Sequence, residues 1–184
     1  MGNLVLFLGG ARSGKSSLAE RMAQDMGGDS VLYVATAEAR DDEMVDRIEK
    51  HQVSRPAAWR TLEEPRQVTA ALRENYQGEK VIMLDCMTLL VTNLLPSGVG
   101  FEQVEVDVDE YERVVMEEIE DLLDFIRETD VTFLLVSNEV GLGLVPAYEL
   151  GRAYRDILGR VNKVLAEAAA KVHFMVAGIP MQIK

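Results

Sequence analysis

The segment Asn3–Ser16, NLVLFLGGARSGKS, decides how the rest of the chain can be arranged. Its apolar start, up to Leu8, predicts a buried strand, and the periodic residues from Ser16 to Met26 predict a helix. The residues between them, GGARSGKS, match the G-x-x-x-x-G-K-[ST] pattern of a phosphate-binding loop. Gly9 and Gly14 permit backbone angles that a β-carbon would forbid, so successive N–H groups can face phosphate oxygens. A chance match to a glycine-rich turn is the alternative, and the strand and helix on the correct sides argue against it.

Two residues of the loop, and an acid later in the chain, add contacts for a nucleotide and a metal ion. Lys15 can reach the β- and γ-phosphates, and the Ser16 hydroxyl can bind Mg²⁺. Asp85 ends the hydrophobic run VIMLD, where proteins of this kind place a second acid on the magnesium side. The alternative for Asp85 is a strand-end acid that caps the next helix. Together the residues predict a site for a nucleoside triphosphate with Mg²⁺.

Short apolar runs alternate with longer periodic segments along the whole chain, which is typical of an α/β protein with a mainly parallel sheet. Because the runs lack polar alternation, helices are expected on both faces of the sheet. The further predicted strands are 30–36, 80–86, 131–137 and 172–177. Further helices are predicted over residues 41–51 and 146–170, and one more lies within the acidic stretch that begins at Glu102. No linker or repeat interrupts the pattern, so we expect a single domain over residues 1–184.

The charge balance narrows the possible partners. The 184 residues include 31 acids and 19 bases, a net charge of −12, which argues against a nucleic-acid-binding protein. The lone Cys86 cannot form an internal disulfide, so we expect a cytoplasmic protein. The longest apolar run outside the first strand is broken by Asp85 and is too short to span a bilayer, so no transmembrane segment is expected.

Most of the negative charge lies in one stretch. Between Glu102 and Asp130 there are 13 acids and two bases. Apolar residues in this stretch recur at steps of three and four, which predicts one buried helical stripe with the acids on the other faces. An amphipathic helix with a solvated acidic face is the interpretation we adopt, and an acidic docking surface is the alternative. The stripe consists of Tyr111, Val115, Ile119, Leu122 and Ile126.

The predicted helix 146–170 contains two glycines. Pro146 stands where a proline in the first helical turn is tolerated. Gly151 and Gly159 each cost about 1 kcal/mol relative to alanine in a helix interior. Their spacing of eight puts them close to one face, so we expect another backbone, a subunit or a ligand to approach there.

The chain has two histidines. His173 lies in an apolar run without acidic or metal-ligand neighbours at useful spacing, which favours a structural role. His51 ends a predicted helix, where a histidine interacts favourably with the helix dipole. It also begins HQVSRPAAW, a segment that combines a possible nucleophile with the cation Arg55. Trp59 in the same segment can stack on a ring or belong to the core.

Several strings taken together resemble one family, the bifunctional adenosylcobinamide kinase/adenosylcobinamide-phosphate guanylyltransferases of cobalamin biosynthesis. They are GGARSGKSSLAE, YVAT, DDEMVDRIEKHQVSRP, LDCMTLLVTNLL, SNEVGLGLVP, GRAYRDILGRVNKVLAEAAA and VAGIP, and they run in order through nearly the whole chain. The phosphate loop is common to many families, whereas the H-x-x-x-R-P and SNEVGLGLVP strings are more specific. The resemblance implies a RecA-like variant of the P-loop fold, a three-layer sandwich, and a homotrimer.

The resemblance also implies two reactions. In the first, ATP or GTP gives its γ-phosphate to adenosylcobinamide. In the second, the histidine that starts the H-x-x-x-R-P string, here His51, attacks the α-phosphate of GTP, and GMP then passes to adenosylcobinamide phosphate. Lys15 is the second catalytic residue. The implied nucleotide contacts are Gly9, Gly10, Ala11, Arg12, Ser13, Gly14, Lys15, Ser16, Ala35, Thr36, Ala37, Gln52, Val53, Ser54, Arg55, Glu63 and Asp85, with Ser16 and Asp85 on the Mg²⁺ side.

Two other functions stay open at this point. A plain small-molecule kinase needs only the phosphate loop and Asp85, and it forms no covalent nucleotide intermediate. A nucleotide-dependent switch would use the acidic helix to engage a partner. The guanine-reading N-K-x-D motif of regulatory GTPases is absent, since the most similar string, Ser137 to Val140, lacks the lysine. The residues therefore leave the choice between ATP and GTP open.

Overall fold

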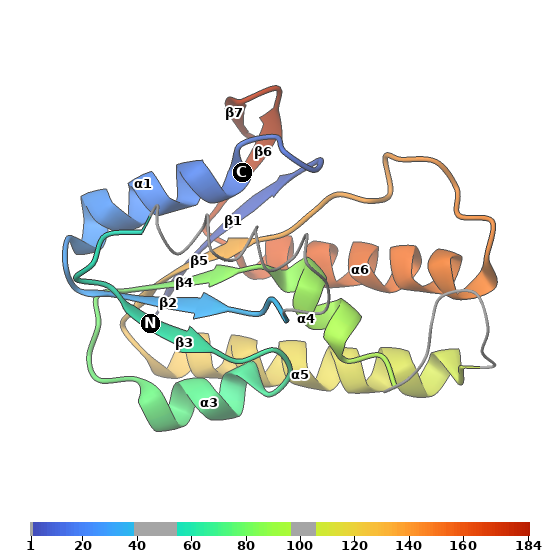
Figure 1. The fold of residues 1–184 in the computed structure, drawn as a ribbon, viewed down its shortest axis with the longest axis horizontal. Helices are drawn as coiled ribbons and strands as arrows, with labels where there is room; N and C mark the ends of the chain where they lie inside the picture. The colour runs from blue at the N-terminus through green and yellow to red at the C-terminus, as the bar shows by residue number, and fades with distance from the viewer. Residues whose placement is uncertain (1, 39–54, 97–105) are drawn as a thin grey trace.

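The centre of the molecule is a seven-stranded sheet with the strand order β3-β2-β4-β5-β1-β6-β7 (Figure 1). The computed structural model describes residues 2–38, 55–96 and 106–184. The strands are β1 (Asn3–Gly9), β2 (Val31–Ala35), β3 (Arg60–Glu63), β4 (Val81–Asp85), β5 (Thr132–Val136), β6 (Lys171–Val176) and β7 (Ile179–Gln182). Neighbouring strands run parallel except β6 and β7, which are antiparallel. The predicted mainly parallel sheet is confirmed.

Helices cover both faces of this sheet. They are α1 (Lys15–Gly27), α3 (Val68–Asn75), α4 (Met87–Asn93), α5 (Val108–Glu128) and α6 (Glu149–Ala168). In Figure 1, α1 lies above the strands, and α3 and α5 lie below them. Side chains of α6 join those of α3 and α5 in one core. The three layers that the resemblance implied are therefore present. The predicted helix 41–51 lies outside the described residues.

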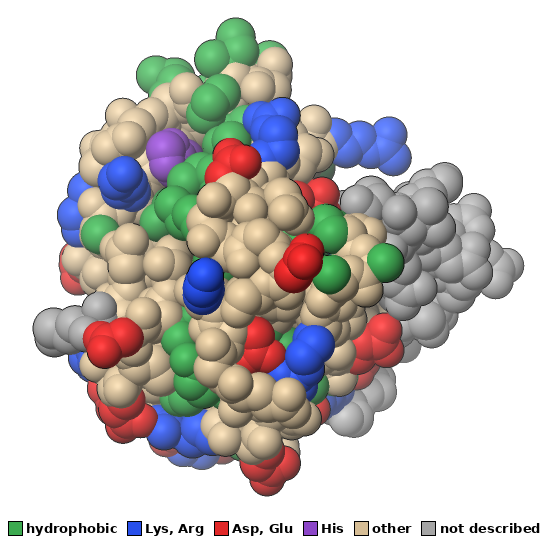
Figure 2. Space-filling view, turned by 90° about the vertical axis from the view of Figure 1, so that its left-hand side faces the viewer, with side chains coloured by type: hydrophobic (Ala, Val, Ile, Leu, Met, Phe, Trp, Pro, Cys, Tyr) green, Lys and Arg blue, Asp and Glu red, His purple; other side chains and the backbone are tan. Residues whose placement is uncertain are grey.

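Two exposed segments carry large apolar side chains. In the loop between β5 and α6, Leu144 is 96% exposed, and Leu142 and Val145 are also open to solvent. Along the β6–β7 hairpin, Ile179 and Met181 are exposed as well. Figure 2 shows hydrophobic side chains gathered at the top of the molecule, over this hairpin, with charges of both signs interspersed below.

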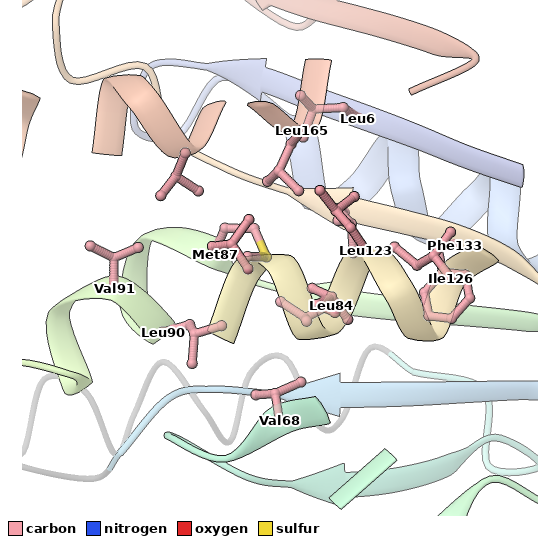
Figure 3. Close-up of a cluster of buried hydrophobic side chains, with 14 of the residues drawn as sticks. Leu6, Val68, Leu84, Met87, Leu90, Val91, Leu123, Ile126, Phe133 and Leu165 are labelled. Atoms are coloured by element: carbon pink, nitrogen blue, oxygen red, sulfur yellow. The ribbon is translucent and has the colours of Figure 1, made fainter. Parts of the chain in front are cut away.

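The strands sort their side chains into two cores, because successive residues of a strand point to opposite faces. Leu4, Leu6 and Leu8 of β1 join the larger core with α3, α4, α5 and α6. Val5 and Phe7 join the smaller core beneath α1. Figure 3 shows part of the larger core, in which side chains from the sheet interdigitate with those of the helices. Parallel strands buried on both faces explain the continuous apolar runs of the sequence.

Helix α5 confirms the amphipathic interpretation of the acidic stretch. All five stripe residues are buried in the larger core. The Asp107 carboxylate caps the helix by accepting a hydrogen bond from the Glu110 backbone N–H at 3.1 Å. On the exposed face, Arg113 forms ion pairs with Glu110 and Glu117. Exposed pairs of this kind stabilise a helix by only about 0.3–0.5 kcal/mol, so burial of the stripe dominates.

Helix α6 begins later than predicted. Pro146 lies in the loop before it, and the helix starts at Glu149 with Tyr148 as its N-cap. At Gly151 a β-carbon would lie 2.8 Å from Cβ of Pro146, a side chain of the preceding loop rather than the other backbone, subunit or ligand that the glycine spacing predicted. At Gly159 a β-carbon would meet no described atom within 4 Å. Within the described chain, Gly151 and Gly159 therefore do not face a common neighbour.

Four elements were not predicted from the sequence. Strands β3 and β7 have only four residues each, and the residues of β7 are all exposed, so no buried apolar run marks them. Helices α3 and α4 have eight and seven residues, too short for a clear helical period. Among the described helices, none has the length and apolar character needed to cross a membrane.

Candidate nucleotide-binding site

The phosphate-binding loop connects β1 to α1, as predicted. Gly9 and Gly14 have φ angles of +149° and +93°, which residues with a β-carbon rarely adopt. A β-carbon at Gly9 would also lie 2.7 Å from the Met175 carbonyl oxygen. Two backbone hydrogen bonds fasten the loop from outside: Glu139 N–H donates to the Gly9 carbonyl at 3.0 Å, and Gly178 N–H donates to the Ser13 carbonyl at 3.1 Å. The loop is thus held in shape by its neighbours.

Lys15 is the first residue of α1 and turns back over the loop. Its Nζ donates to the Gly10 carbonyl at 2.6 Å and lies 3.4 Å from Ser13 Oγ. Ser16 follows in the first helical turn and is partly exposed. The N-terminus of a helix attracts anions through its unpaired N–H groups and its dipole. The loop, the ammonium and the helix end therefore converge on one place for a phosphate group.

The other predicted residues align along the same edge of the sheet. Asp85, the last residue of β4, pairs in register with Ala35 of β2, and Ala35 pairs with Glu63 of β3. All three stand at the carboxyl ends of their strands, as Gly9 does on β1. Strand β5 lies between β4 and β1. In open α/β sheets this edge is where ligands bind.

Tyr33 connects Asp85 to Arg55. Its hydroxyl donates to Asp85 Oδ2 at 3.1 Å, and the Arg55 guanidinium carbon lies 3.5 Å from the centre of its ring. Burial, and then the Asp85 carboxylate, raises the pKa of Tyr33 well above its usual range, so the phenol keeps its proton. Arg55 Nε is buried and has no hydrogen-bond partner among the described residues. A buried donor without a partner fits a site that awaits an anionic ligand.

Thr36 holds the ends of β2 and β4 together. Its Oγ1 donates to the Cys86 carbonyl at 2.8 Å and accepts from the Cys86 backbone N–H at 2.9 Å. Asn93 Nδ2 donates to the Thr36 carbonyl at 2.7 Å. The Thr36 side chain is fully buried, so it fixes the strand ends next to Asp85.

An open cavity of about 210 Å³ lies beside this edge. Its lining residues are Arg55, Pro56, Ala57, Trp59, Thr61 and Glu63. Trp59 is only 7% exposed, packs in the core beneath α1, and donates from Nε1 to the Gly28 carbonyl at 2.9 Å. Of the two interpretations of Trp59, the core residue is confirmed.

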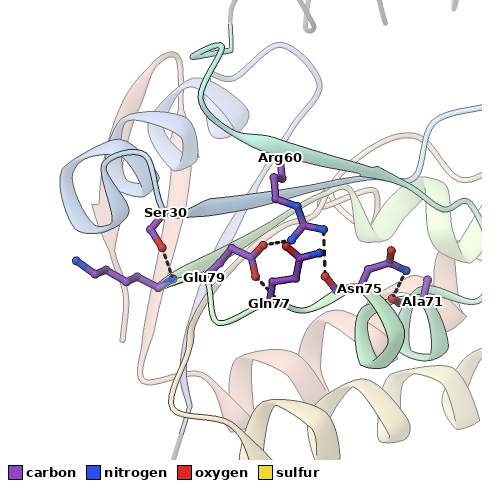
Figure 4. Close-up of polar contacts among 7 residues, drawn as sticks. Ser30, Arg60, Ala71, Asn75, Gln77 and Glu79 are labelled. Carbon is purple, nitrogen blue, oxygen red and sulfur yellow. Dashed lines mark hydrogen bonds and ion pairs between the residues drawn. The ribbon is translucent and has the colours of Figure 1, made fainter.

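An ion pair anchors the strand that carries Glu63 (Figure 4). Arg60, the first residue of β3, pairs with Glu79 and donates from Nη2 to the Asn75 carbonyl at 3.1 Å. Glu79 Oε2 in turn accepts from the Gln77 backbone N–H at 2.8 Å. Glu79 is buried, so its charge is compensated by these donors. The short edge strand β3 is thereby tied to the segment between α3 and β4.

Several predicted residues lie outside the described chain: His51, Gln52, Val53 and Ser54. His173 is described and stacks on Phe7 with 5.4 Å between ring centres. Burial lowers its pKa, consistent with the predicted structural role.

The sequence interpretation missed Tyr33. Period-two alternation places Tyr33 on the face that Asp85 occupies one strand away, and a polar aromatic in a buried strand was the available signal.

The donor set at this edge fits Mg²⁺. The Ser16 hydroxyl and the Asp85 carboxylate are hard oxygen ligands, and Mg²⁺ in nucleotide sites takes few protein ligands besides phosphates and water. In the described ranges, no group of three His, Cys, Asp or Glu side chains could hold a metal ion by itself.

The protein belongs to the class of phosphate-loop nucleotide-binding proteins. This class is defined by the phosphate loop between β1 and α1 and by the acid at the end of a strand on the same edge of the sheet. Within it, a family model described as cobinamide kinase / cobinamide phosphate guanyltransferase matches residues 5–183. The chain belongs to this family. It is 46% identical over 179 residues to the bifunctional adenosylcobalamin biosynthesis protein CobP of Pseudomonas aeruginosa, covering 97% of this chain and 96% of that protein.

Two enterobacterial relatives agree with this assignment. The bifunctional adenosylcobalamin biosynthesis proteins CobU of Escherichia coli and Salmonella typhimurium are 41% and 42% identical over 182 residues. Each alignment covers 98% of this chain and 99% of the relative.

Two solved structures of other proteins are also similar in shape. The flagellar accessory protein FlaH of Methanocaldococcus jannaschii has a TM-score of 0.48 and 17% identity, covering 98% of this chain and 76% of FlaH. A DnaB-like replicative helicase has a TM-score of 0.49 and 16% identity, covering 94% of this chain and 46% of the helicase chain. The fold class rests on the strand order and the phosphate loop described above.

Proposed function

We propose that this enzyme acts twice on one corrinoid. It first transfers the γ-phosphate of ATP or GTP to the aminopropanol hydroxyl of adenosylcobinamide, and it then transfers GMP from GTP to the new phosphate. The products are adenosylcobinamide-GDP, a nucleoside diphosphate and pyrophosphate. The observation that carries the proposal is a complete phosphate loop at the ligand edge of the sheet, in a chain whose family is described by both transfers.

In the kinase step, the substrate hydroxyl oxygen bonds to the γ-phosphorus and releases its proton to water, while the bond from that phosphorus to the β-phosphate oxygen breaks. Loop N–H groups and Lys15 stabilise the charge that moves onto the β-phosphate. Ser16 and Asp85 would hold Mg²⁺, which neutralises phosphate charge when bound. The Gly10 carbonyl already holds the Lys15 ammonium at the loop, so little reorientation is needed.

In the guanylyl step, a nitrogen of His51 bonds to the α-phosphorus of GTP, and pyrophosphate leaves. The phosphate of adenosylcobinamide phosphate then attacks the same phosphorus and releases the histidine. A neutral imidazole is available near pH 7, because its reference pKa is about 6.5. Arg55, four positions after His51, has a buried Nε without a described partner, which suits a phosphate oxygen.

The remaining nucleotide contacts follow from the same edge. We assign the cavity of about 210 Å³ between Arg55 and Glu63 to part of the guanosine nucleotide. Ala35 and Ala37 contribute from the end of β2, where the fully buried Thr36 holds the strand ends in place, and Gln52, Val53 and Ser54 contribute from the segment that follows His51. Glu63 is exposed at the cavity, where its carboxylate can accept from base or ribose donors.

The test is incubation with Mg²⁺ and GTP radiolabelled at the α-phosphate, followed by denaturation and gel analysis. Wild type should retain an acid-labile, base-stable label, and His51→Ala should retain none. His173→Gln is the matched control, because the half-buried His173 stacks on Phe7. This variant should label like wild type. Unlabelled wild type that still transfers γ-phosphate to adenosylcobinamide would leave the plain-kinase alternative.

We further propose a cytoplasmic homotrimer. The number of subunits comes from the family resemblance. The exposed Leu142, Leu144 and Val145, together with the apolar side chains of the β6–β7 hairpin, support association, because segments of this kind bury themselves against partners. Light scattering coupled to size exclusion should give three times the 20.4 kDa chain mass. Leu144→Asp should lower that mass, and a monomeric wild type would contradict the assembly.

A further inference from the structure

Tyr33 occupies an unusual position between two charged groups. Its side chain is 2% exposed and belongs to the core beneath α1. The hydroxyl end reaches Asp85 Oδ2 at 3.1 Å, and the ring face lies 3.5 Å from the Arg55 guanidinium carbon. One rigid side chain therefore contacts a carboxylate at the end of β4 and an arginine in the segment before β3.

The hydroxyl contact fixes the carboxylate. The Tyr33 hydroxyl donates to a carboxylate oxygen, and hydrogen bonds between a hydroxyl and a carboxylate are stronger than those between neutral groups. Because the phenol is buried, water competes poorly for this bond. The bond to Oδ2 sets the rotation of the Asp85 carboxyl group about its Cβ–Cγ bond, and with it the direction of the other oxygen.

The ring contact fixes the arginine. A guanidinium over an aromatic face is held by cation–π attraction and stacking, and its N–H donors lie in its own plane, away from the ring. The Nε donor of Arg55 has no partner among the described residues. Stacking on Tyr33 therefore orients Arg55 without using the donors that would bind a phosphate.

We propose that Tyr33 is a positioning residue that sets Asp85 and Arg55 at a fixed distance from each other. Through it, the acid on the magnesium side and the arginine beside the His51 segment act on one nucleotide. This inference rests on the proposed function for the roles of Asp85 and Arg55. The new claim is that the buried Tyr33 side chain orients both groups. Substitutions can remove its hydroxyl contact separately from its ring contact.

Two variants separate the ends. Tyr33→Phe keeps the ring under Arg55 and removes the hydroxyl from Asp85. Tyr33→Leu removes both contacts. Met83→Leu is the matched control, because Met83 pairs with Tyr33 in register, is fully buried in the same core, and changes little in volume.

The first measurement is calorimetric binding of a non-hydrolysable GTP analogue at rising Mg²⁺ concentration. Tyr33→Phe should need about tenfold more Mg²⁺ than wild type to reach half of the Mg²⁺-dependent gain in affinity, and saturating Mg²⁺ should restore the wild-type Kd. Tyr33→Leu should bind about fivefold more weakly even at saturating Mg²⁺, because Arg55 is no longer held. Met83→Leu should match wild type in both respects.

The second measurement is the kinase rate as a function of Mg²⁺. Tyr33→Phe should raise the KM for Mg²⁺ and leave kcat unchanged, a split that general loosening of the fold does not produce. An unchanged Mg²⁺ requirement in Tyr33→Phe, or an equal defect in Met83→Leu, overturns the inference. If GTP radiolabelled at the α-phosphate does not label the wild-type protein, the guanylyl step is refuted. The calorimetric comparison would still decide the role of Tyr33.

Discussion

Of the described helices, only α1 packs on one face of the sheet, whereas α3, α4, α5 and α6 pack on the other. The thinner side uses small residues, Ala19 and Ala23, to bring α1 close to the strands. The same side holds Tyr33 and its contacts to Asp85 and Arg55. On the thicker side, the Asn93 amide of α4 donates to the Thr36 carbonyl, and Asn162 Oδ1 of α6 accepts from the Ser137 hydroxyl at 2.6 Å. The side chain that contacts both Asp85 and Arg55 thus lies beneath α1, whereas the four other helices bury the larger core.

The largest effect should come from Lys15→Ala. Losing the ammonium removes one charge that stabilises the transferring phosphates, so kinase turnover should fall about 10²–10³-fold. Stability should change little, because the lost hydrogen bonds to Gly10 and Ser13 contribute modestly. Turnover of γ-labelled nucleotide and thermal unfolding would be measured side by side. Lys163→Ala, an exposed site on α6, is the control. If Lys15→Ala keeps its kinase turnover, the phosphate loop does not take part in the phosphoryl transfer.

Leu134 and Leu135 offer a direct test of the two faces. They are neighbours on β5, both fully buried, and they point into the smaller and the larger core. Each substitution to alanine should cost about 2–5 kcal/mol of unfolding free energy in urea. Only Leu134→Ala should also weaken nucleotide binding, severalfold, because it leaves a void beneath α1. Equal loss of affinity in both variants would show that the faces are not separable.

Two glycines of α6 sharpen the comparison from the thicker side. Gly159→Ala should stabilise the protein by about 1 kcal/mol, since the added methyl meets no described atom and helix propensity improves. Gly151→Ala should be destabilising by about 1–3 kcal/mol, because its β-carbon would lie 2.8 Å from Pro146. The urea midpoint of unfolding of each variant measures its change in stability. Guanylylation should not change with Gly159→Ala. A destabilised Gly159→Ala would show that another molecule packs on this helix.

The smallest effect concerns pH and Glu118. From α5, its Oε1 accepts from the Thr69 N–H and hydroxyl, both at 2.9 Å, at the start of α3. Burial raises the pKa of Glu118. The folded form therefore gains stability that is complete below the unfolded pKa, about 4.3, and is lost as pH rises through the folded pKa.

Glu118→Gln resembles the protonated acid and should retain that stability at every pH. Relative to wild type, the variant should therefore become more stable between about pH 4 and about pH 7. Urea unfolding at the two pH values measures the difference, and the exposed Glu120→Gln serves as the control. A stability difference that is the same at both pH values would mean that Glu118 does not titrate differently on folding.

Much of the fold was predictable because its signals are local. The apolar runs of β1, β2, β4, β5 and β6 and the stripe of α5 each follow from burial of one segment. Strand β3 was not predictable, since it depends on the distant partners Glu79 and Asn75 of Arg60. The phosphate loop and Asp85 were predictable from spacing. The role of Tyr33 was not, because its contact with Asp85 joins residues on separate strands.

The bond from the Gly178 N–H to the Ser13 carbonyl joins two segments from opposite parts of the chain. Strand β1, which leads into the phosphate loop, lies between β5 and β6, both of which come late in the sequence. On a ribosome, the loop thus emerges before β5 and β6, and it lacks these neighbours until both strands have followed. Such long-range pairing is slow to form. The nascent chain should consequently acquire nucleotide binding only after β6 has emerged, when α5 and α6 have already been made.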